Sequence, residues 1–274
     1  MKTAIIIPAR YGSTRFPGKP LVKIGGKSML ERVVEIGRNA IKDRPSIALA
    51  VATEDKRIAD HCEGLGVDCY VTSPDCPTGS DRILEASNMM AAHNPGQGYD
   101  FIIGLQGDAP FTPPQAIHKM LEAVDDNPSI DVVTPVINLR WNELSDLRDA
   151  KNITPFSGTT AIIDQNGTAL WFSKNIIPAI RKEDMQRKVS EFSPVYQHIG
   201  LYGYRADILK NFVALPQSRY EQLEGLEQLR LLENGITIQT VTLDVEAGLA
   251  QAGIDSPEDV ERVERVISQH GEPF

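Results

Sequence analysis

The sequence predicts an α/β fold in which helices cover both faces of a mostly parallel sheet. Three observations predict it: short apolar runs typical of fully buried strands, stretches with helical spacing between them, and polar loops directly after the runs. Strands and helices that alternate in this rhythm form parallel sheets with crossover helices. Ligands of such sheets bind beyond the carboxyl ends of the strands.

The first hundred or so residues carry this alternation most clearly. Helical spacing is seen at 29–41 and is closed by Pro45, and residues 53–55 suit the start of a second helix. Buried strands are predicted at 4–7, 47–52, 68–72 and 101–105. We therefore expect three loops to open on the same edge of the sheet, at 8–20, 73–82 and 106–110.

The pattern changes from about residue 131. Strands are predicted at 132–137, 159–163, 169–172 and 197–204, and a partly helical stretch at 141–152. Residues 181–193 are charged and poorly periodic, which indicates an exposed, mobile loop. Later come a helix at 220–232 ended by Asn234 and Gly235, a strand at 236–243, and a last helix whose first residue is Pro257. We expect one domain, 1–274, with a sheet extension of mixed strand direction at about 131–204.

Composition limits the classes of function. At 274 residues the chain can bury a full core, and a net charge of −9 argues against general affinity for nucleic acid. The three cysteines are odd in number and lack metal-site spacing, which favours reduced thiols in a cytosol. No signal peptide and no long apolar run are recognisable, so neither secretion nor membrane insertion is expected.

The loop at 8–20 is the most informative stretch. It combines two glycines with three cations, Arg10, Arg15 and Lys19, in an otherwise acidic chain. Glycines let main-chain N–H groups approach phosphate oxygens while the cations neutralise charge, so the loop predicts an anion site. A solvated basic turn is the plainer alternative. The motifs of P-loop NTPases and of dinucleotide sites are absent.

Two aspartates are candidates for metal binding. Asp108 follows a predicted strand, and Asp255 precedes the last helix. Mg²⁺ takes one or two carboxylates together with phosphate oxygens and waters, so the pair beside the basic loop suggests a metal–nucleotide site. Each aspartate has a plainer role as a turn or helix cap.

The chain resembles the 3-deoxy-manno-octulosonate (Kdo) cytidylyltransferases. The resemblance is carried, in order, by PARYGSTRFPGKPL at 8–21, VATED at 51–55, TSPDCPTGSDR at 72–82, LQGD at 105–108, ALWFS at 169–173, HIGLYGYR at 198–205, LEQLRLLENG at 226–235 and GIDSPED at 253–259. Such co-linear matches over nearly the whole chain are more specific than any single motif.

The resemblance implies a three-layer, nucleotidyltransferase-like (Rossmann-like) fold. It also implies a cytoplasmic enzyme that uses CTP, Mg²⁺ and a 2-keto sugar acid to make a CMP-sugar and pyrophosphate for lipopolysaccharide or capsule. A homodimer formed through the sheet extension is implied as well.

Site residues are carried over from the matching motifs. Catalysis is expected of Lys19, Asp108 and Asp255, the two aspartates holding Mg²⁺. The nucleotide is expected to contact Arg10, Ser13, Arg15, Lys19, Ser80, Arg82 and Gln106. The sugar acid is expected to contact Lys174, His198, Tyr202, Glu227 and Gln228, although a strand histidine such as His198 can also be a satisfied core residue.

Departures from the pattern of the family concern the acceptor. Ala109 replaces the usual acidic residue, Lys174 replaces the usual arginine, and residues 157–162 differ from the common strand. A lysine holds a carboxylate as a point charge, without the fork of arginine. The acceptor is therefore expected to be Kdo or an amino or deoxy variant. A nine-carbon acid of the sialic or pseudaminic type, or a non-catalytic nucleotide-binding regulator, are the alternatives.

Overall fold

The computed structural model describes residues 1–12, 16–93, 98–247, 254 and 257–270. The chain divides into two compact units. The first comprises Met1–His118, Leu201–Val213 and Ala252–Phe274, and the second comprises Lys119–Gly200 and Ala214–Gln251. Helices α4 (Pro114–Asp126) and α7 (Ala206–Ala214) each contain residues of both units. The expectation of one domain stays a prediction.

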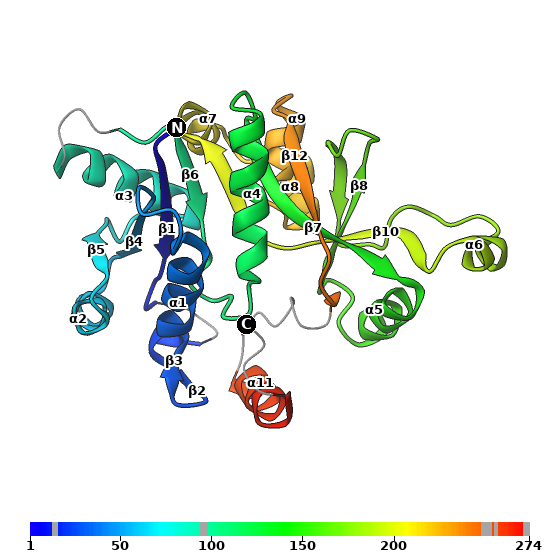
Figure 1. Ribbon diagram of the computed structural model, residues 1–274, viewed down its shortest axis with the longest axis horizontal. Helices are drawn as coiled ribbons and strands as arrows, with labels where there is room; N and C mark the ends of the chain where they lie inside the picture. The colour runs from blue at the N-terminus through cyan, green and yellow to red at the C-terminus, as the bar shows by residue number, and fades with distance from the viewer. Residues whose placement is uncertain (13–15, 94–97, 248–253, 255–256, 271–274) are drawn as a thin grey trace. The chain divides into compact units, whose positions relative to one another are not determined.

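The first unit contains the predicted parallel sheet. Strands β5 (Asp68–Val71), β4 (Ala48–Thr53), β1 (Thr3–Pro8) and β6 (Phe101–Gly104) lie side by side in this order, and all three pairings are parallel (Figure 1). Strand β11 (Tyr202–Arg205) is antiparallel to β6. The prediction of a mostly parallel sheet is confirmed, and the carboxyl ends of β1, β4, β5 and β6 share one edge.

Helices cover both faces of this sheet. The in-register residues Ile5 and Leu49 point to one face, and a Cβ on Gly37 of α1 (Met29–Ile41) would lie 2.8 Å from Leu49 Cδ1. Gly104 belongs to the opposite face, where a Cβ would lie 2.5 Å from Ile83 Cδ1 of α3 (Gly79–His93). Hence α1 and α3 pack on opposite faces, and the three-layer prediction is confirmed in this unit.

Local sequence signals explain where these helices begin and end. The Ser28 hydroxyl accepts the main-chain N–H of Glu31, and Glu31 Oε2 accepts the N–H of Ser28, so α1 starts with a capping box. Asp55 caps α2 (Lys56–Leu65), and Gly66 ends it at φ 61°. The predictions for the α1 helix and for the start of α2 are confirmed.

Smaller elements complete the first unit. They are the 3-10 helix η1 (Lys19–Leu21), the hairpin of β2 (Lys23–Ile24) and β3 (Lys27–Ser28), and α11 (Pro257–His270), which starts at Pro257 as predicted. One core cluster joins distant segments: Ile24, Met29, Phe111, Ile254 and Val263. Ile254 therefore belongs to the same core cluster as Phe111, which follows the 106–110 loop.

The second unit contains strands of mixed direction. Strand β7 (Val132–Arg140) is parallel to β12 (Ile238–Leu243) and antiparallel to β10 (Phe192–His198). Strand β10 pairs with β8 (Thr159–Ile163), and β8 pairs with β9 (Ala169–Ser173), both antiparallel. The predicted mixed direction is confirmed. The helices here are α5 (Trp141–Ile153), α6 (Glu183–Val189), α8 (Arg219–Glu224) and α9 (Leu229–Glu233).

Several predicted boundaries are wrong. The 197–204 segment is two strands, because exposed Gly200 interrupts the run of strand formers between β10 and β11. The 220–232 helix is broken into α8 and α9 by Gly225, whose φ of 63° ends α8. The supposed loop at 181–193 contains α6, where Glu183 accepts hydrogen bonds from Arg148 and Arg187.

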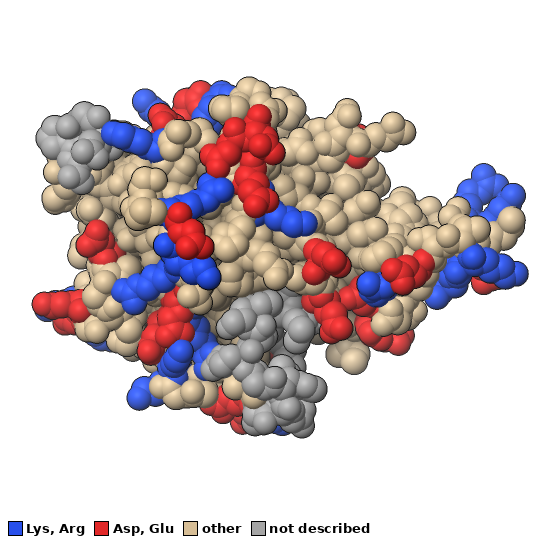
Figure 2. All heavy atoms as spheres, viewed as in Figure 1, with Lys and Arg blue, Asp and Glu red and all other residues tan. Residues whose placement is uncertain are grey.

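The distribution of charge on the surface agrees with the expectation that the chain has no general affinity for nucleic acid. On the face drawn in Figure 2, acidic and basic side chains are interspersed, and no broad basic surface is seen. Among the described residues, no helix is both long and apolar enough to span a membrane.

Candidate active site

A pocket in the first unit lies at the carboxyl ends of β1 and β6. Its volume is about 920 Å³, which includes space that is open to solvent. The lining residues come from the three loops that were predicted to share an edge: Pro8, Ala9, Arg10, Lys19, Pro20, Cys76, Pro77, Thr78, Gly79, Arg82, Gln106 and Asp108. Three cations and one carboxylate among them make the pocket suited to a polyanion with a metal ion.

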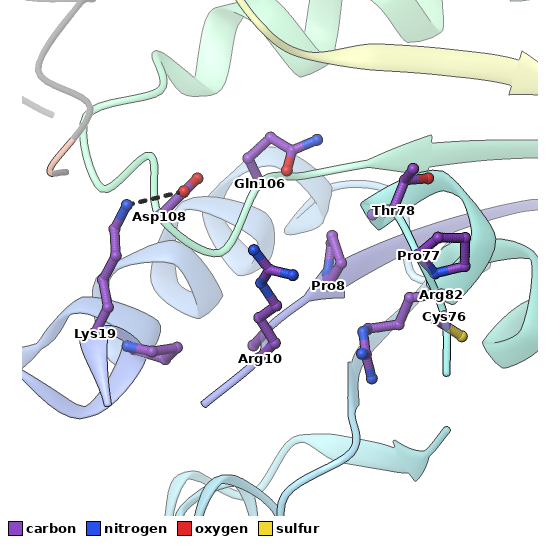
Figure 3. A pocket seen from close by; sticks show the side chains of 12 residues that line it. Pro8, Arg10, Lys19, Cys76, Pro77, Thr78, Arg82, Gln106 and Asp108 are labelled. Atoms are coloured by element: carbon purple, nitrogen blue, oxygen red, sulfur yellow. Dashed lines mark hydrogen bonds and ion pairs between the residues drawn. The ribbon is translucent and has the colours of Figure 1, made fainter. Parts of the chain in front are cut away.

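Lys19 and Asp108 form an ion pair at one end of this pocket. Lys19 Nζ lies 3.0 Å from Asp108 Oδ2, and Figure 3 shows the two side chains directed toward one another. The Lys19 side chain is 9% exposed and that of Asp108 is 51% exposed. The ammonium is thus buried beside a carboxylate that still faces solvent, and a phosphate could replace that carboxylate as its partner.

The turn after β6 brings Asp108 close to the first loop. A Cβ on Gly107 would lie 2.6 Å from the main-chain oxygen of Pro8, so only glycine fits there. This close approach explains the Gln106-Gly107-Asp108 sequence in packing terms, and it places both polar side chains in the pocket.

Arg82 comes from the second of the three loops, at 73–82. The structure starts α3 at Gly79, within the predicted 73–82 loop, because Thr78 caps it: Thr78 Oγ1 donates to Asp81 Oδ2 at 2.6 Å and accepts the N–H of Asp81 at 3.3 Å. Arg82 therefore lies in the first turn, and Ser80 beside it is buried. Arg82 Nη1 donates to Thr72 Oγ1 at 2.6 Å and lies 2.9 Å from Glu54 Oε2.

Sequence reasoning missed part of this pocket. Thr78 and Cys76 line it, and Glu54 forms an ion pair with Arg82. The sequence predicts a helix start at residues 53–55 and a motif match at 51–55, but no role in the site for Glu54. The Cys76 thiol donates to Glu85 Oε2 at 3.0 Å, and burial together with Glu85 raises the pKa of Cys76 to about 12. The thiol stays protonated at neutral pH, in agreement with the interpretation of all three cysteines as free thiols.

His198, of the second unit, is a neutral imidazole. Desolvation, assisted by the charge of Lys174, lowers the pKa of His198 to about 3. Its Nε2 lies 2.9 Å from Thr134 Oγ1, and its ring makes an edge contact with Phe172 at 5.0 Å between centroids. Such a ring can exchange hydrogen bonds without carrying charge.

The other predicted sugar residues fall in both units. Lys174 has its main chain fixed, because its N–H donates to Glu224 Oε2 at 2.8 Å. Glu227 Oε1 lies 3.7 Å from Arg230, and Gln228 is buried. Tyr202 belongs to the first unit and stacks on Tyr204 at 5.9 Å. The structure brings Arg10, Lys19, Arg82, Gln106 and Asp108 together in one pocket; Ser13, Arg15 and Asp255 lie outside the described residues.

The donor set of the pocket fits a hard cation. Asp108 presents half-exposed carboxylate oxygens, and Mg²⁺ needs only one or two such ligands when phosphate and water supply the rest. Within the part of the chain that is described, no three side chains from histidine, cysteine, aspartate or glutamate form a metal cluster. A metal held by protein alone is therefore not indicated among those residues, whereas a metal shared with a bound nucleotide fits.

Comparison with known proteins gives consistent similarities. The sequence model of the cytidylyltransferase family matches residues 4–238. The 3-deoxy-manno-octulosonate cytidylyltransferase of Maricaulis maris is 42% identical over 273 residues, 99% of each chain, and that of Syntrophotalea carbinolica is 39% identical, over 96% of this chain and 98% of its own. A solved CMP:2-keto-3-deoxy-manno-octonic acid synthetase complexed with CTP is 32% identical with a TM-score of 0.80, over 98% of this chain and 99% of its own.

Proposed function

The chain belongs to the cytidylyltransferase family, and we propose that it transfers CMP from CTP to the anomeric hydroxyl of 3-deoxy-manno-octulosonate or a close variant. The products are the CMP-sugar and pyrophosphate. The observation that carries this proposal is the Arg10, Lys19, Arg82 and Asp108 pocket, in a chain similar along its whole length to enzymes named for this reaction. The CMP-sugar would serve lipopolysaccharide or capsule synthesis, in the cytoplasm where CTP is made.

The pocket supplies what a triphosphate needs. Arg10 and Lys19 come from the first loop, and Arg82 from α3, so three cations approach the phosphates from different elements. Ser13 and Arg15 would add contacts from the same first loop. Gln106 and Ser80 would frame the cytosine and ribose, since an amide and a hydroxyl can pair with the edge of a base.

The reaction is an in-line displacement at the α-phosphorus. The anomeric hydroxyl oxygen forms the new P–O bond, the bond to the β-phosphate breaks, pyrophosphate leaves, and the hydroxyl proton passes to solvent. Catalysis of phosphoryl-type transfer consists mainly of positioning and charge neutralisation. In this chain Lys19 and the two arginines hold the phosphates in place and offset the charge that builds on the leaving group.

Asp108 and Asp255 are the residues that would hold Mg²⁺. When bound, the ion polarises the α-phosphate and lowers the pKa of the attacking hydroxyl. The core cluster that contains both Phe111 and Ile254 supports this pair, because these residues lie three positions after Asp108 and one before Asp255.

The acceptor would be held by Lys174, His198, Tyr202, Glu227 and Gln228. Lys174 supplies a positive charge for the carboxylate of the sugar acid, and neutral His198 suits a hydroxyl better than an anion. A lysine, lacking the arginine fork, binds the carboxylate at one point. This difference is the reason to test modified sugars beside Kdo.

A homodimer formed through residues 131–204 is also proposed. Large apolar side chains of this stretch are exposed: Ile153 at 85%, Phe156 at 79%, Met185 at 62% and Val189 at 80%. Apolar side chains gathered in one region of a chain often mark an interface with another chain.

Pyrophosphate release tests the activity. The purified protein is assayed with CTP, Mg²⁺ and a panel of Kdo, its amino and deoxy variants and nine-carbon acids, with ATP and UTP in place of CTP as controls. We expect turnover with CTP and an eight-carbon 2-keto-3-deoxy acid. A preference for a nine-carbon acid would change the assigned substrate to an acid of the sialic or pseudaminic type. No turnover with any sugar acid would overturn the proposal.

A further inference from the structure

We propose that Glu54 is a positioning residue for the nucleotide: one carboxylate oxygen fixes the loop that carries Arg10 and Lys19, and the other holds Arg82. This inference rests on the proposed function, since it concerns the same CTP pocket. Glu54 itself is not among the residues that line the pocket. It would therefore act through the cations and not by touching the nucleotide.

Parallel strand pairing brings Glu54 beside the first loop. Strand β4 ends at Thr53, and in the register of β1 with β4 Pro8 lies opposite Ala52. The main-chain N–H of Ala9 continues the pairing by donating to the oxygen of Ala52 at 2.8 Å. Glu54 follows directly after β4, and its side chain lies beside the start of the first loop.

One oxygen of Glu54 closes the first loop. The N–H of Tyr11 donates to Glu54 Oε1 at 3.0 Å, and the carbonyl of Tyr11 accepts the N–H of Gly18, also at 3.0 Å. Gly18 has φ 72°, and a Cβ there would lie 3.1 Å from the Tyr11 ring, so the position favours glycine. Arg10 precedes Tyr11 and Lys19 follows Gly18. Fixing the Tyr11 backbone therefore fixes the bases of both cations.

The Tyr11 side chain is also held by residues near Glu54. The guanidinium carbon of Arg57 lies 3.3 Å from the centroid of the Tyr11 ring. Arg57 is itself held by two hydrogen bonds to Asp55, at 2.9 and 2.6 Å. Residues 54–57 thus hold Tyr11 through both its main chain and its ring, from the start of α2.

The second oxygen of Glu54 compensates a buried cation. Glu54 Oε2 lies 2.9 Å from Arg82 Nη1, and the two side chains are 17% and 4% exposed. A buried guanidinium without a nearby anion is costly, and its side chain would turn toward solvent or toward another anion. With Thr72 Oγ1 at 2.6 Å on the same nitrogen, Arg82 is held in one orientation before any nucleotide binds.

We expect Asp108 and Glu54, the two carboxylates that pair with pocket cations, to have different roles. Asp108, which pairs with Lys19, lines the pocket and is half exposed, so a phosphate and a metal can reach it. Glu54 is mostly buried behind Arg82 and lies outside the lining, so it stays paired when the nucleotide is bound. A preorganised cation loses less freedom on binding than a mobile one, so Glu54 should strengthen CTP binding.

The test compares Glu54→Gln and Glu54→Asp with Glu35→Gln. Glu35 is a matched control, since it pairs with Lys27 at 2.7 and 2.8 Å in the same unit but lies away from the pocket. Calorimetry gives the Kd for CTP, kinetics give both KM values, and thermal melting gives stability. We expect Glu54→Gln to weaken CTP binding about ten- to a hundredfold, because the buried Arg82 loses its ion pair with Glu54, and the KM for the sugar acid should stay within about twofold. Glu54→Asp should recover part of the affinity, and Glu35→Gln should change none of it.

A double-mutant cycle with Arg82→Gln separates positioning from simple destabilisation. The double variant buries no unpaired charge, so it should fold even if Glu54→Gln does not, and Glu54→Gln should weaken CTP binding less in it than in the wild-type background. Wild-type CTP affinity in Glu54→Gln, or full additivity in the cycle, would overturn the inference alone. Failure of the wild-type protein to bind CTP would overturn the proposed function, and the inference with it.

Discussion

The ammonium of Lys19 lies 3.0 Å from Asp108 Oδ2, although the first side chain is buried and the second is half exposed. A buried cation needs an anion more than an exposed carboxylate needs a cation, because burial penalises the unpaired charge. A bound triphosphate offers Lys19 another anion and frees Asp108 for a metal. The pair is therefore arranged for an exchange of partners when CTP binds, and two predictions follow from it.

Asp108→Asn should lower kcat by at least about a hundredfold, because a metal ligand is worth several kcal/mol in the transition state. CTP binding without metal should be kept or slightly tightened, since Lys19 loses a competing anion. Pyrophosphate release and calorimetry measure the two effects separately. Asp60→Asn, which alters an exposed carboxylate paired with Lys56 on α2, is the control. Unchanged turnover in Asp108→Asn would remove Asp108 from the metal site.

Lys19→Met should weaken CTP binding about ten- to a hundredfold, because it removes a charged hydrogen-bond donor while the buried aliphatic stem is kept. The melting temperature should change little for the same reason. Calorimetry with CTP and thermal melting measure both. Lys23→Met, at an exposed position of β2, should leave the affinity unchanged. A loss of stability as large as the loss of affinity would show that Lys19 mainly supports the fold.

His198 gives a prediction for pH. The pKa of His198 is lowered to about 3 in the folded chain, from about 6.5 in an unfolded one, so the unfolded state binds more protons between these values. The stability that comes from neutral His198 is then fully present above about pH 6.5. As the pH falls toward 3, the free energy of unfolding decreases by up to about 1.4 kcal/mol per pH unit. His198→Gln, which keeps a partner for Thr134, should flatten this slope in denaturant titrations between pH 7 and pH 4. Equal slopes in the two proteins would contradict a neutral, desolvated His198.

The extent to which the sequence predicts this structure depends on how local each signal is. The start of α2, the parallel strands and the convergence of three loops follow from neighbouring residues, and they are confirmed. The break at Gly225 was missed because apolar spacing continues across it, and only the left-handed φ of that residue shows the end of α8.

Side-chain partners distant in the chain could not be predicted in the same way. Glu54 lies 28 positions before Arg82, and Thr134 lies 64 before His198, so their contacts depend on strand register and helix packing. The sequence indicated Arg10 and Lys19, since loops of that composition are unusual, whereas Arg82 was assigned to the site only by the family resemblance. It did not indicate Glu54, which precedes the N-cap Asp55 and resembles an ordinary surface carboxylate until the fold brings Arg82 to it.

The proposed homodimer predicts a change in assembly. Phe156→Asp places a charge on an apolar side chain that is 79% exposed and belongs to the 131–204 extension, so it should weaken a dimer formed there without disturbing the core. Analytical ultracentrifugation should show a dimer for the wild-type protein and a shift toward monomer for the variant. Leu223→Asp changes a residue of α8 that is 70% exposed but outside the extension, and it should leave the dimer intact. If Leu223→Asp dissociates the dimer and Phe156→Asp does not, the interface includes α8 and the extension is not its centre.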